Sequence, residues 1–353
     1  MKHRVLESSP PPNPIHQTRD PDRAREGRER KGRTKGEAHG APQRQRRQTG
    51  LKAKDKRLIA VLGMCRAMTL DQVVALLGNP RDTRTVHNRL RALAGDTGNV
   101  KLPDFGAVAL RRLRFRAYDG APLILWAPAH TGFAIAQREL GRELTPPRAG
   151  GGISFAEHFV ALTDLFVGLV RPYFLADTPL RELPFGWDVA DDMRLPWREP
   201  TEAGELRDRA IRPDAILTIP SARRRIFIEC ETGTHTLVSV RKDRHQATVH
   251  KAARYETFLR GLADVPRRLT HYAARYPDGW TADVLFLVLT EGRRASTEAA
   301  LATVARNTAR VTLRVDTLEQ ALAHLQTLLP SAPGPADARP PASPPLIPKN
   351  IGR

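Results

Sequence analysis

The order of sequence patterns between residues 153 and 329 restricts the fold more than any other feature of this chain. An amphipathic helical pattern at 154–172 precedes two short apolar runs at 215–219 and 226–228, which are typical of buried strands. Helical patterns then follow at 242–261, 297–307 and 318–329, and strand-like patterns lie between them at 282–292 and 310–316. This succession predicts an α/β fold with a mixed sheet and helices on its faces.

Composition separates this region from the rest of the chain. Residues 51–147 form another patterned segment, which a linker rich in proline and glycine at 145–152 joins to 153–329. Residues 1–50 carry thirteen Lys or Arg and six Asp or Glu with almost no bulky apolar side chains, so this basic arm is expected to be disordered. The arm could hold phosphates without reading sequence, or could simply keep the chain soluble. The proline-rich tail at 330–353 is also expected to be disordered.

The charge of the chain favours a polyanionic partner. There are 57 Lys and Arg against 38 Asp and Glu, a formal net charge of +19, which is typical of proteins that bind nucleic acid or an acidic membrane surface. The N-terminus lacks the apolar segment of a secretory signal, and the apolar run at 284–289 is too short to span a bilayer. The only two cysteines, Cys65 and Cys230, lie in apolar patterns, which argues against a disulfide framework or a cysteine-based zinc site. We therefore expect a cytoplasmic protein without a membrane partner.

The start of the 51–147 segment has the pattern of a helix-turn-helix. Apolar residues recur at helical spacing in 54–68, and Thr69 can cap a short second helix at 70–78. A turn then leads into a third helix at 82–95, whose inner face would carry Val86, Leu90 and Leu93. Three helices with a tight turn before the last are what this motif requires, with the third helix in the major groove. The outer face of that helix carries Arg84, His87, Asn88 and Arg91.

Two strand-like runs at 108–128 follow the third helix directly, so the segment is expected to be a winged helix-turn-helix. Arginines on such a wing could reach phosphates or the minor groove. The first run alternates apolar and basic residues except between Leu110 and Leu113, which suggests a bulge. Winged helices also bind proteins, and an arginine-rich face can simply be solvated. The candidates for groove contacts are Arg84, His87, Asn88 and Arg91, and the candidates for backbone contacts are Arg89, Arg111, Arg112, Arg114 and Arg116.

Three carboxylates stand at the edges of the two short strands in the 153–329 region. Asp214 begins the first strand, whereas Glu229 and Glu231 end the second and share one side of it because they are two residues apart. If the strands pair as a hairpin, Asp214 would lie close to Glu229. Oxygen ligands grouped in this way suit a hard divalent cation, so Asp214, Glu229 and Glu231 are candidate ligands for Mg²⁺, which would polarise a phosphodiester and activate water.

The PD pair at 213–214 and the ECE triplet at 229–231 are similar to the core of PD-(D/E)xK nucleases, a restriction-endonuclease-like fold. In that pattern the third position of the triplet is lysine, whereas this chain has Glu231, so Lys242 or Lys251 on the following helix would have to supply the cation. A nuclease of this type would use Asp214, Glu229, Glu231 and Lys251 for catalysis. In the structural alternative, Asp214 caps a strand end and the glutamates pair with Arg223, Arg224, Arg241 or Arg244.

The chain as a whole resembles the bacterial replication-relaxation family, whose members are associated with plasmids and mobile elements. The resemblance covers about residues 55–329. It rests on the TLDQ turn at 69–72, the helix that contains His158 and Asp164, the PDAILTI strand, and the ECETGTHTL segment followed by a basic helix ending in RYETFL. It implies DNA binding in the replication or mobilisation of extrachromosomal DNA, and the glutamate at 231 looks typical of members whose nuclease-like domain is not catalytic.

These patterns lead to three hypotheses. The leading one is a DNA-binding protein of the replication-relaxation type, with double-stranded DNA and replication or mobilisation proteins as partners and a homodimer left open. The second is a Mg²⁺-dependent endonuclease that uses Asp214, Glu229 and Glu231. The third is a regulator whose wing binds an acidic protein.

Overall fold

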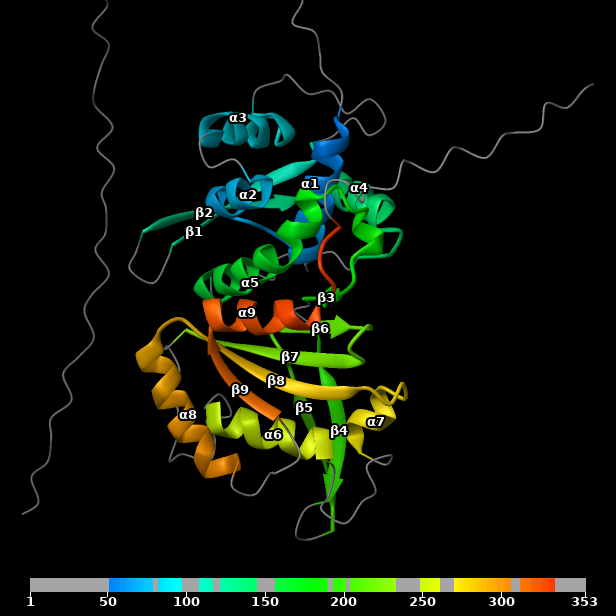
Figure 1. Ribbon diagram of the computed structural model, residues 1–353, viewed down its shortest axis with the longest axis vertical. Coiled ribbons are helices and arrows are strands. Elements are labelled where there is room, and N and C mark those ends of the chain that lie inside the picture. The colour runs from blue at the N-terminus through cyan, green and yellow to red at the C-terminus, as the bar shows by residue number, and fades with distance from the viewer. Residues whose placement is uncertain are drawn as a thin grey trace, which may run out of the picture. The chain divides into compact units, whose positions relative to one another are not determined.

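The computed structural model describes residues 51–78, 82–96, 108–116, 121–144, 156–189, 193–200, 204–232, 248–260, 270–305 and 312–333, and Figure 1 shows their helices and strands. The basic arm at 1–50, the linker at 145–152 and most of the proline-rich tail lie outside the described residues. The turn between the second and third helices and the turn of the following hairpin lie outside them too. Expectations for these segments therefore remain predictions.

Three helices begin the described chain: α1 (Ala53–Cys65), α2 (Leu70–Leu77) and α3 (Thr83–Leu93). Thr69 caps α2 as expected, because its side chain accepts a hydrogen bond from the Gln72 N–H while the Gln72 side chain accepts from the Thr69 N–H. Gly78 ends α2 with a φ of 70°, in the left-handed region that favours glycine. The inner face of α3 is buried through the three apolar residues predicted for it.

A hairpin follows, formed by β1 (Leu110–Arg116) and β2 (Pro122–Pro128). Its antiparallel register is continuous from Leu110↔Pro128 to Arg116↔Pro122. The predicted bulge was therefore wrong: two consecutive arginines interrupt the apolar alternation of β1 without adding a residue to the strand. Helix α4 (His130–Leu140), which the sequence patterns did not predict, comes next and packs on α1. The two helices approach closely because Gly63 has no side chain where Ala136 lies.

Helix α5 (Ala156–Leu175) connects the two parts of the fold. It packs on α2, on α9 (Leu318–Leu328) and on the sheet, and Figure 1 shows α5 and α9 lying between the α1–α4 group and the strands. The segment His158–Leu175 is long and apolar enough to cross a membrane by length and composition, but more than half of it is buried inside the structure. The apolar side chains of α5 therefore pack in the hydrophobic core.

The central sheet has five described strands in the order β3-β6-β7-β8-β9. Strand β6 pairs antiparallel with β3 and β7, whereas β7, β8 and β9 run parallel, so the mixed α/β sheet expected from the sequence is confirmed. The strands are β3 (Gly186–Asp188), β6 (Ala215–Ile219), β7 (Arg224–Glu231), β8 (Thr281–Val288) and β9 (Thr312–Thr317).

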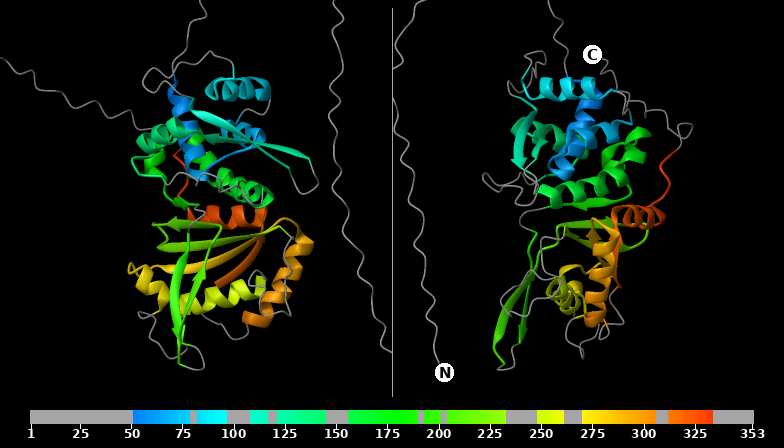
Figure 2. Two further views of the ribbon diagram at one scale, coloured as in Figure 1. Left: turned by 180° about the vertical axis from the view of Figure 1, so that it is seen from behind. Right: turned by 90° about the vertical axis from the view of Figure 1, so that its left-hand side faces the viewer.

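Helices cover both faces of this sheet, and a separate two-stranded ribbon lies beside it. Helices α5 and α9 cover one face, and α6 (Thr248–Arg260), α7 (His271–Arg275) and α8 (Glu291–Ala305) cover the other. A separate antiparallel ribbon of β4 (Leu195–Pro200) and β5 (Leu206–Ile211) lies beside α6, and Figure 2 shows it extending away from the central sheet. A short 3-10 helix, η2 (Leu180–Glu182), precedes β3.

One hydrophobic core runs through both sequence regions. It extends from Leu58 in α1 through Phe166 in α5 to Leu325 in α9, and it includes the α5 side of β6, β7 and β8. A second cluster, centred on Phe227 and Phe258, fills the space between the sheet and α6. The regions 51–147 and 153–329 therefore share buried surface, with α5 contributing to both.

Candidate functional sites: a basic helix face and a lysine-centred carboxylate cluster

The exposed face of α3 carries three of the four residues predicted for the major groove. Arg84 and Asn88 are exposed and Arg91 is half-buried. Their spacing of four and then three residues places them on one side of the helix. His87 is different, because its ring packs edge-on against Trp126 of β2 at 5.9 Å between centroids. His87 is half-buried and its ring helps to seat α3 on the hairpin, and its contact with the groove stays a prediction.

Arg89, predicted to contact the DNA backbone, is half-buried and paired within the fold. Its guanidinium donates to both carboxylate oxygens of Asp55, with Nε 2.9 Å from Oδ1 and Nη2 on Oδ2. The hydrogen bond that Arg89 donates to Asp55 raises the pKa of Arg89 above its ordinary value. A bidentate pair of this kind fixes the orientation of α3 against α1, so the guanidinium of Arg89 is occupied and we remove it from the set of proposed phosphate contacts.

The arginines of the hairpin are divided between its two faces. Because the register is continuous, Arg112 and Arg114 share a face with Trp126, whereas Arg111 lies on the face that carries Leu113. All three are exposed; Arg116 shares the face of Arg112, but its side chain lies outside the described residues. The Leu113 face packs toward α5, and the Trp126 face contacts α3. The predicted wing arginines are therefore not a single set.

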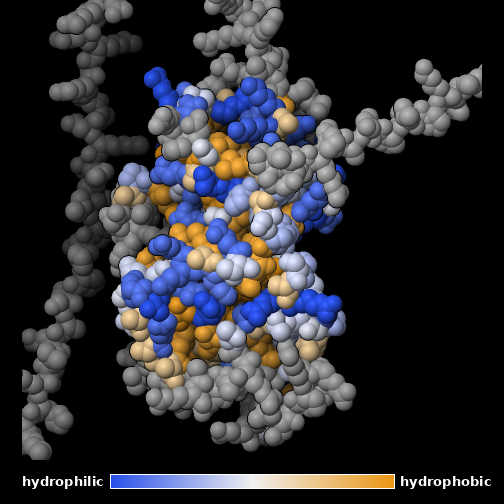
Figure 3. Space-filling view, viewed as in Figure 1, coloured by the Kyte–Doolittle hydropathy of each residue, from blue (hydrophilic) through white to orange (hydrophobic). Residues whose placement is uncertain are grey.

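Helix α3 and the hairpin meet at Asp96. Its carboxylate lies 3.7 Å from Nε of Arg91 and 3.4 Å from Nη2 of Arg112. The guanidinium of Arg112 also lies over the ring of Trp126, at 6.0 Å. These contacts place cationic side chains of the helix and of the strand next to each other, and Figure 3 shows hydrophilic side chains gathered over the end of the molecule that carries α3.

The three predicted acids converge at the end of the β6–β7 hairpin. Ala215 pairs with Ile228, and the Asp214 N–H donates to the Ile228 carbonyl at 2.9 Å, so Asp214 lies opposite Glu229. The carboxylate of Asp214 accepts the backbone N–H of Cys230 at 2.7 Å. Asp214 is half-buried, whereas Glu229 and Glu231 are 2% and 0% exposed. The hairpin geometry on which the metal hypothesis depended is therefore present.

Lys251 of α6 supplies the cation at this cluster. Its ammonium Nζ lies 2.8 Å from Oε2 of Glu229 and 3.3 Å from Oε1 of Glu231. Of the two lysines considered from the sequence, Lys251 is thus the one that reaches the carboxylates; Lys242 lies outside the described residues. Tyr255, one helical turn after Lys251, donates its hydroxyl to Oε1 of Glu229 at 2.6 Å. Glu229, Glu231, Lys251 and Tyr255, together with Asp214, are called the lysine-centred cluster below.

Burial shapes the titration of this cluster. Removal from water raises the pKa of Glu229 to about 7, against the opposing attraction of Lys251. Burial also raises the pKa of Asp214, and Lys251 and the Cys230 N–H oppose that rise. For Lys251 burial acts to lower the pKa, but attraction to Glu229, Glu231 and Asp214 is stronger and the pKa is raised. The ammonium therefore stays charged, while Glu229 can hold a proton near neutral pH.

The donors around these carboxylates compete with a metal ion for the same oxygens. Both oxygens of Glu229 accept hydrogen bonds, one from Lys251 and one from Tyr255. Oε2 of Glu231 has no hydrogen-bond partner among the described residues, and Nη2 of Arg293 lies 3.9 Å from it. Within the part of the chain that the structure describes, no three His, Cys, Asp or Glu residues are grouped so as to hold a metal ion. As arranged, these residues fit an ammonium better than Mg²⁺.

Sequence reasoning missed Tyr255 and Arg293 as members of this site. Tyr255 was detectable in principle, because it follows Lys251 by four residues on the same helix. Arg293 comes from α8, far away in sequence. Of the arginines offered as structural partners, Arg224 pairs instead with Asp283 and Arg223 stands in the turn with a φ of 49°. Residues 241 and 244 lie outside the described residues, so their pairing stays a prediction.

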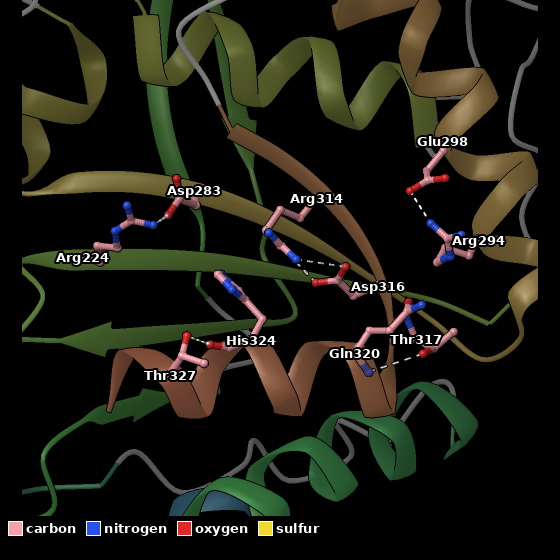
Figure 4. Close-up of polar contacts among 10 residues, drawn as sticks. All are labelled: Arg224, Asp283, Arg294, Glu298, Arg314, Asp316, Thr317, Gln320, His324 and Thr327. Carbon is pink, nitrogen blue, oxygen red and sulfur yellow. Dashed lines mark hydrogen bonds and ion pairs between the residues drawn. The ribbon is translucent and has the colours of Figure 1, made fainter. Parts of the chain in front are cut away.

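A separate polar strip crosses the other face of the sheet. Arg224 bonds Asp283 at 3.0 Å and Arg314 bonds Asp316 at 3.1 Å, while His324 extends toward them from α9 (Figure 4). Burial and the nearby Arg314 lower the pKa of His324. Each aspartate is buried and is neutralised by its own, partly exposed arginine, so the strip is a set of ion pairs at the border of α9.

Two motifs that carry the family resemblance contact each other. Gln72 of the TLDQ turn donates its amide to the Asp164 carboxylate of α5 at 2.8 Å and to the Val160 carbonyl at 3.0 Å. Burial raises the pKa of Asp164, and the bond from Gln72 opposes that rise.

Comparison with known protein families, with curated proteins and with solved structures finds no match for this chain.

Proposed function

We propose that this chain binds double-stranded DNA through a winged helix-turn-helix composed of α1–α3 and the β1–β2 hairpin. The α/β region, with its nuclease-like strand pair, would act as an assembly or accessory platform, as the resemblance to the replication-relaxation family implies. The observation that carries the proposal is the meeting of α3 and the hairpin at Asp96, which sets the half-buried Arg91 of α3 beside the exposed Arg112 of β1. Helix α3 has the length and the solvent-facing polar side that insertion into a major groove requires.

The proposed contacts divide by chemistry. Arg84 and Asn88 have side chains that can read base edges, since arginine pairs with guanine and asparagine with adenine through two hydrogen bonds. Arg91, Arg112 and Arg114 are suited to phosphates, where a guanidinium adds affinity without sequence information. The Asp96 carboxylate would repel the same phosphates. Arg91 and Arg112 must therefore neutralise Asp96 before their remaining positive charge can attract DNA.

The test is a double substitution on the exposed face of α3. Changing Arg84 and Arg91 together to Ala should weaken binding of a labelled duplex and lower the slope of log affinity against log salt by about 0.9 for each phosphate contact that is lost. Fluorescence anisotropy over a series of salt concentrations measures both quantities. Exposed Arg171 and Arg181, which lie outside this face, are changed together to Ala as the control for net charge. Equal loss in both double variants would contradict the proposal.

The endonuclease hypothesis remains the alternative, because the acids and Lys251 do converge. Its difficulty is that Lys251 and Tyr255 already occupy Glu229. We expect purified protein to leave supercoiled plasmid intact in the presence of Mg²⁺ or Mn²⁺. Nicking or linearisation that disappears in Asp214→Ala, with unchanged duplex binding, would establish the nuclease and overturn the proposed non-catalytic role.

A further inference from the structure

A cleft of about 460 Å³ lies at the edge strand β3, on the opposite edge of the sheet from β9. Its walls come from the end of α1, the residues after α4, strands β3 and β6, the start of β4 and the end of α7. None of its lining residues belongs to the lysine-centred cluster or to the exposed face of α3. Its volume falls within the range of about 300–1,000 Å³ typical of small-molecule sites.

The described lining is cationic. Arg66, Arg142, Arg194 and Arg275 face two acids, Glu143 and Asp188. Arg142 is anchored across the cleft, because it donates to the Trp187 carbonyl at 3.2 Å and lies 3.4 Å from the Asp188 carboxylate. Guanidinium groups are weakly hydrated, planar and always charged, which makes them the preferred partners of phosphate oxygens.

Trp187 adds an unsatisfied donor to this cleft. The residue lines the cleft, is 1% exposed, and packs its ring on Phe166. Its indole Nε1–H is buried and has no hydrogen-bond partner among the described residues. Buried donors in folded proteins are nearly always paired, so this unpaired one suits an acceptor other than those that the described residues supply.

Backbone strain at Arg66 points the same way. Arg66 ends α1 with a φ of 76°, a conformation that non-glycine residues rarely adopt. Strain of this kind persists where the surrounding structure enforces it, and such positions gather at ligand sites. Apolar walls next to the arginines, including Leu144 and Ile216, and the ring of Tyr276 provide a surface for a flat ring.

We propose that this cleft binds a phosphate-bearing small molecule of mononucleotide size. The arginines would hold the phosphate, the indole N–H of Trp187 would donate to a ligand oxygen or ring nitrogen, and Tyr276 with the apolar walls would hold the base. The proposal is independent of duplex binding by α3, because no residue is shared between the two surfaces.

The test uses the full-length chain and a panel of the four ribonucleoside 5′-monophosphates. Inorganic phosphate and the free nucleosides, which are the two halves of each monophosphate, are titrated separately as controls. Isothermal titration calorimetry should show saturable binding of at least one monophosphate, and at least tenfold weaker binding of either half. Arg142→Gln should weaken that binding at least tenfold. Arg138→Gln, one helical turn earlier on α4, exposed and outside the cleft, should leave it unchanged. If Arg142→Gln does not fold, the exposed Arg275 is changed to Gln instead.

Trp187→Phe provides a second readout, because it keeps the ring and removes only the donor. It should weaken binding about tenfold, as expected for one lost hydrogen bond to a charged group. The proposal is overturned if no monophosphate binds saturably up to millimolar concentration, or if Arg138→Gln and Arg142→Gln have equal effects. Displacement of the monophosphate by a DNA duplex would also overturn it, since the cleft would then be part of a duplex surface.

Discussion

At the scale of single residues, Glu229 makes a prediction about pH. Its carboxyl group has a pKa near 4.5 when unfolded and about 7 in the fold, so between these values the native state holds a proton that the unfolded state has lost. Stability from this group is therefore fully present below about pH 4.5 and is lost as pH rises through about 7. The wild-type free energy of unfolding should fall by roughly 2 kcal/mol more than that of Glu229→Gln between pH 5 and pH 8.

Urea denaturation at a series of pH values measures this difference. At pH 5 Glu229→Gln is expected to resemble the wild type, because a protonated carboxyl, like the amide, keeps one carbonyl oxygen to accept from Lys251 or Tyr255. The informative quantity is the slope of stability against pH. Identical slopes in the two proteins would show that Glu229 does not titrate in this range.

The contacts of individual side chains were also the part of the candidate sites that the sequence predicted least completely. Helical spacing correctly separated the buried face of α3 from its polar face. It could not show that Arg89 binds Asp55 or that His87 packs on Trp126, because both partners come from other elements. A polar residue has the same pattern whether it meets solvent, DNA or a distant carboxylate.

At the scale of elements, the contact between α1 and α4 depends on Gly63. A Cβ placed there would lie 2.7 Å from the Ala136 Cβ and 2.9 Å from Leu144 Cδ1. Gly63→Ala should therefore lower stability by about 1–2 kcal/mol, since the overpacking cost exceeds the gain in helix propensity. Gly292→Ala is the control, because a Cβ at this α8 position meets nothing within 4 Å and should be neutral or slightly stabilising. Chemical denaturation distinguishes the two, and a stabilised Gly63→Ala would contradict the close packing.

The elements with long and regular patterns were predicted, and the short ones were not. The helices and strands from α5 to α9 appear in the predicted order. Strand β3 has only three residues and helix α7 only five. Strands β4 and β5 have six residues each but are mostly charged residues and proline, so their patterns do not stand out from loops. Helix α4 was missed although it has eleven residues, because it follows β2 directly after a single residue.

At the scale of the whole molecule, the shared core predicts cooperative unfolding. Residues from α1 to α9 belong to one buried cluster, and α5 packs on elements from both sequence regions. Calorimetry of the full-length chain should show one transition, coincident with those measured by circular dichroism and tryptophan fluorescence. A fragment of residues 153–329 should lack a cooperative transition, because it would expose the face of α5 that packs on α2. Two resolved transitions would indicate independent domains.

The sequence by itself determined the α/β class, the order of the main elements, the Thr69 cap of α2 and the grouping of acids at the β6–β7 hairpin. These features depend on side-chain periodicity and on neighbours within a few residues, which a sequence displays directly. Only the tertiary structure decided that Lys251 and Tyr255 occupy the carboxylates, that Asp55 takes Arg89, that α5 joins the two regions in one core, and that four arginines surround a cleft at β3. These features depend on partners that are distant in the chain. Burial sets how strongly charged groups interact, and it exists only once those partners have packed together.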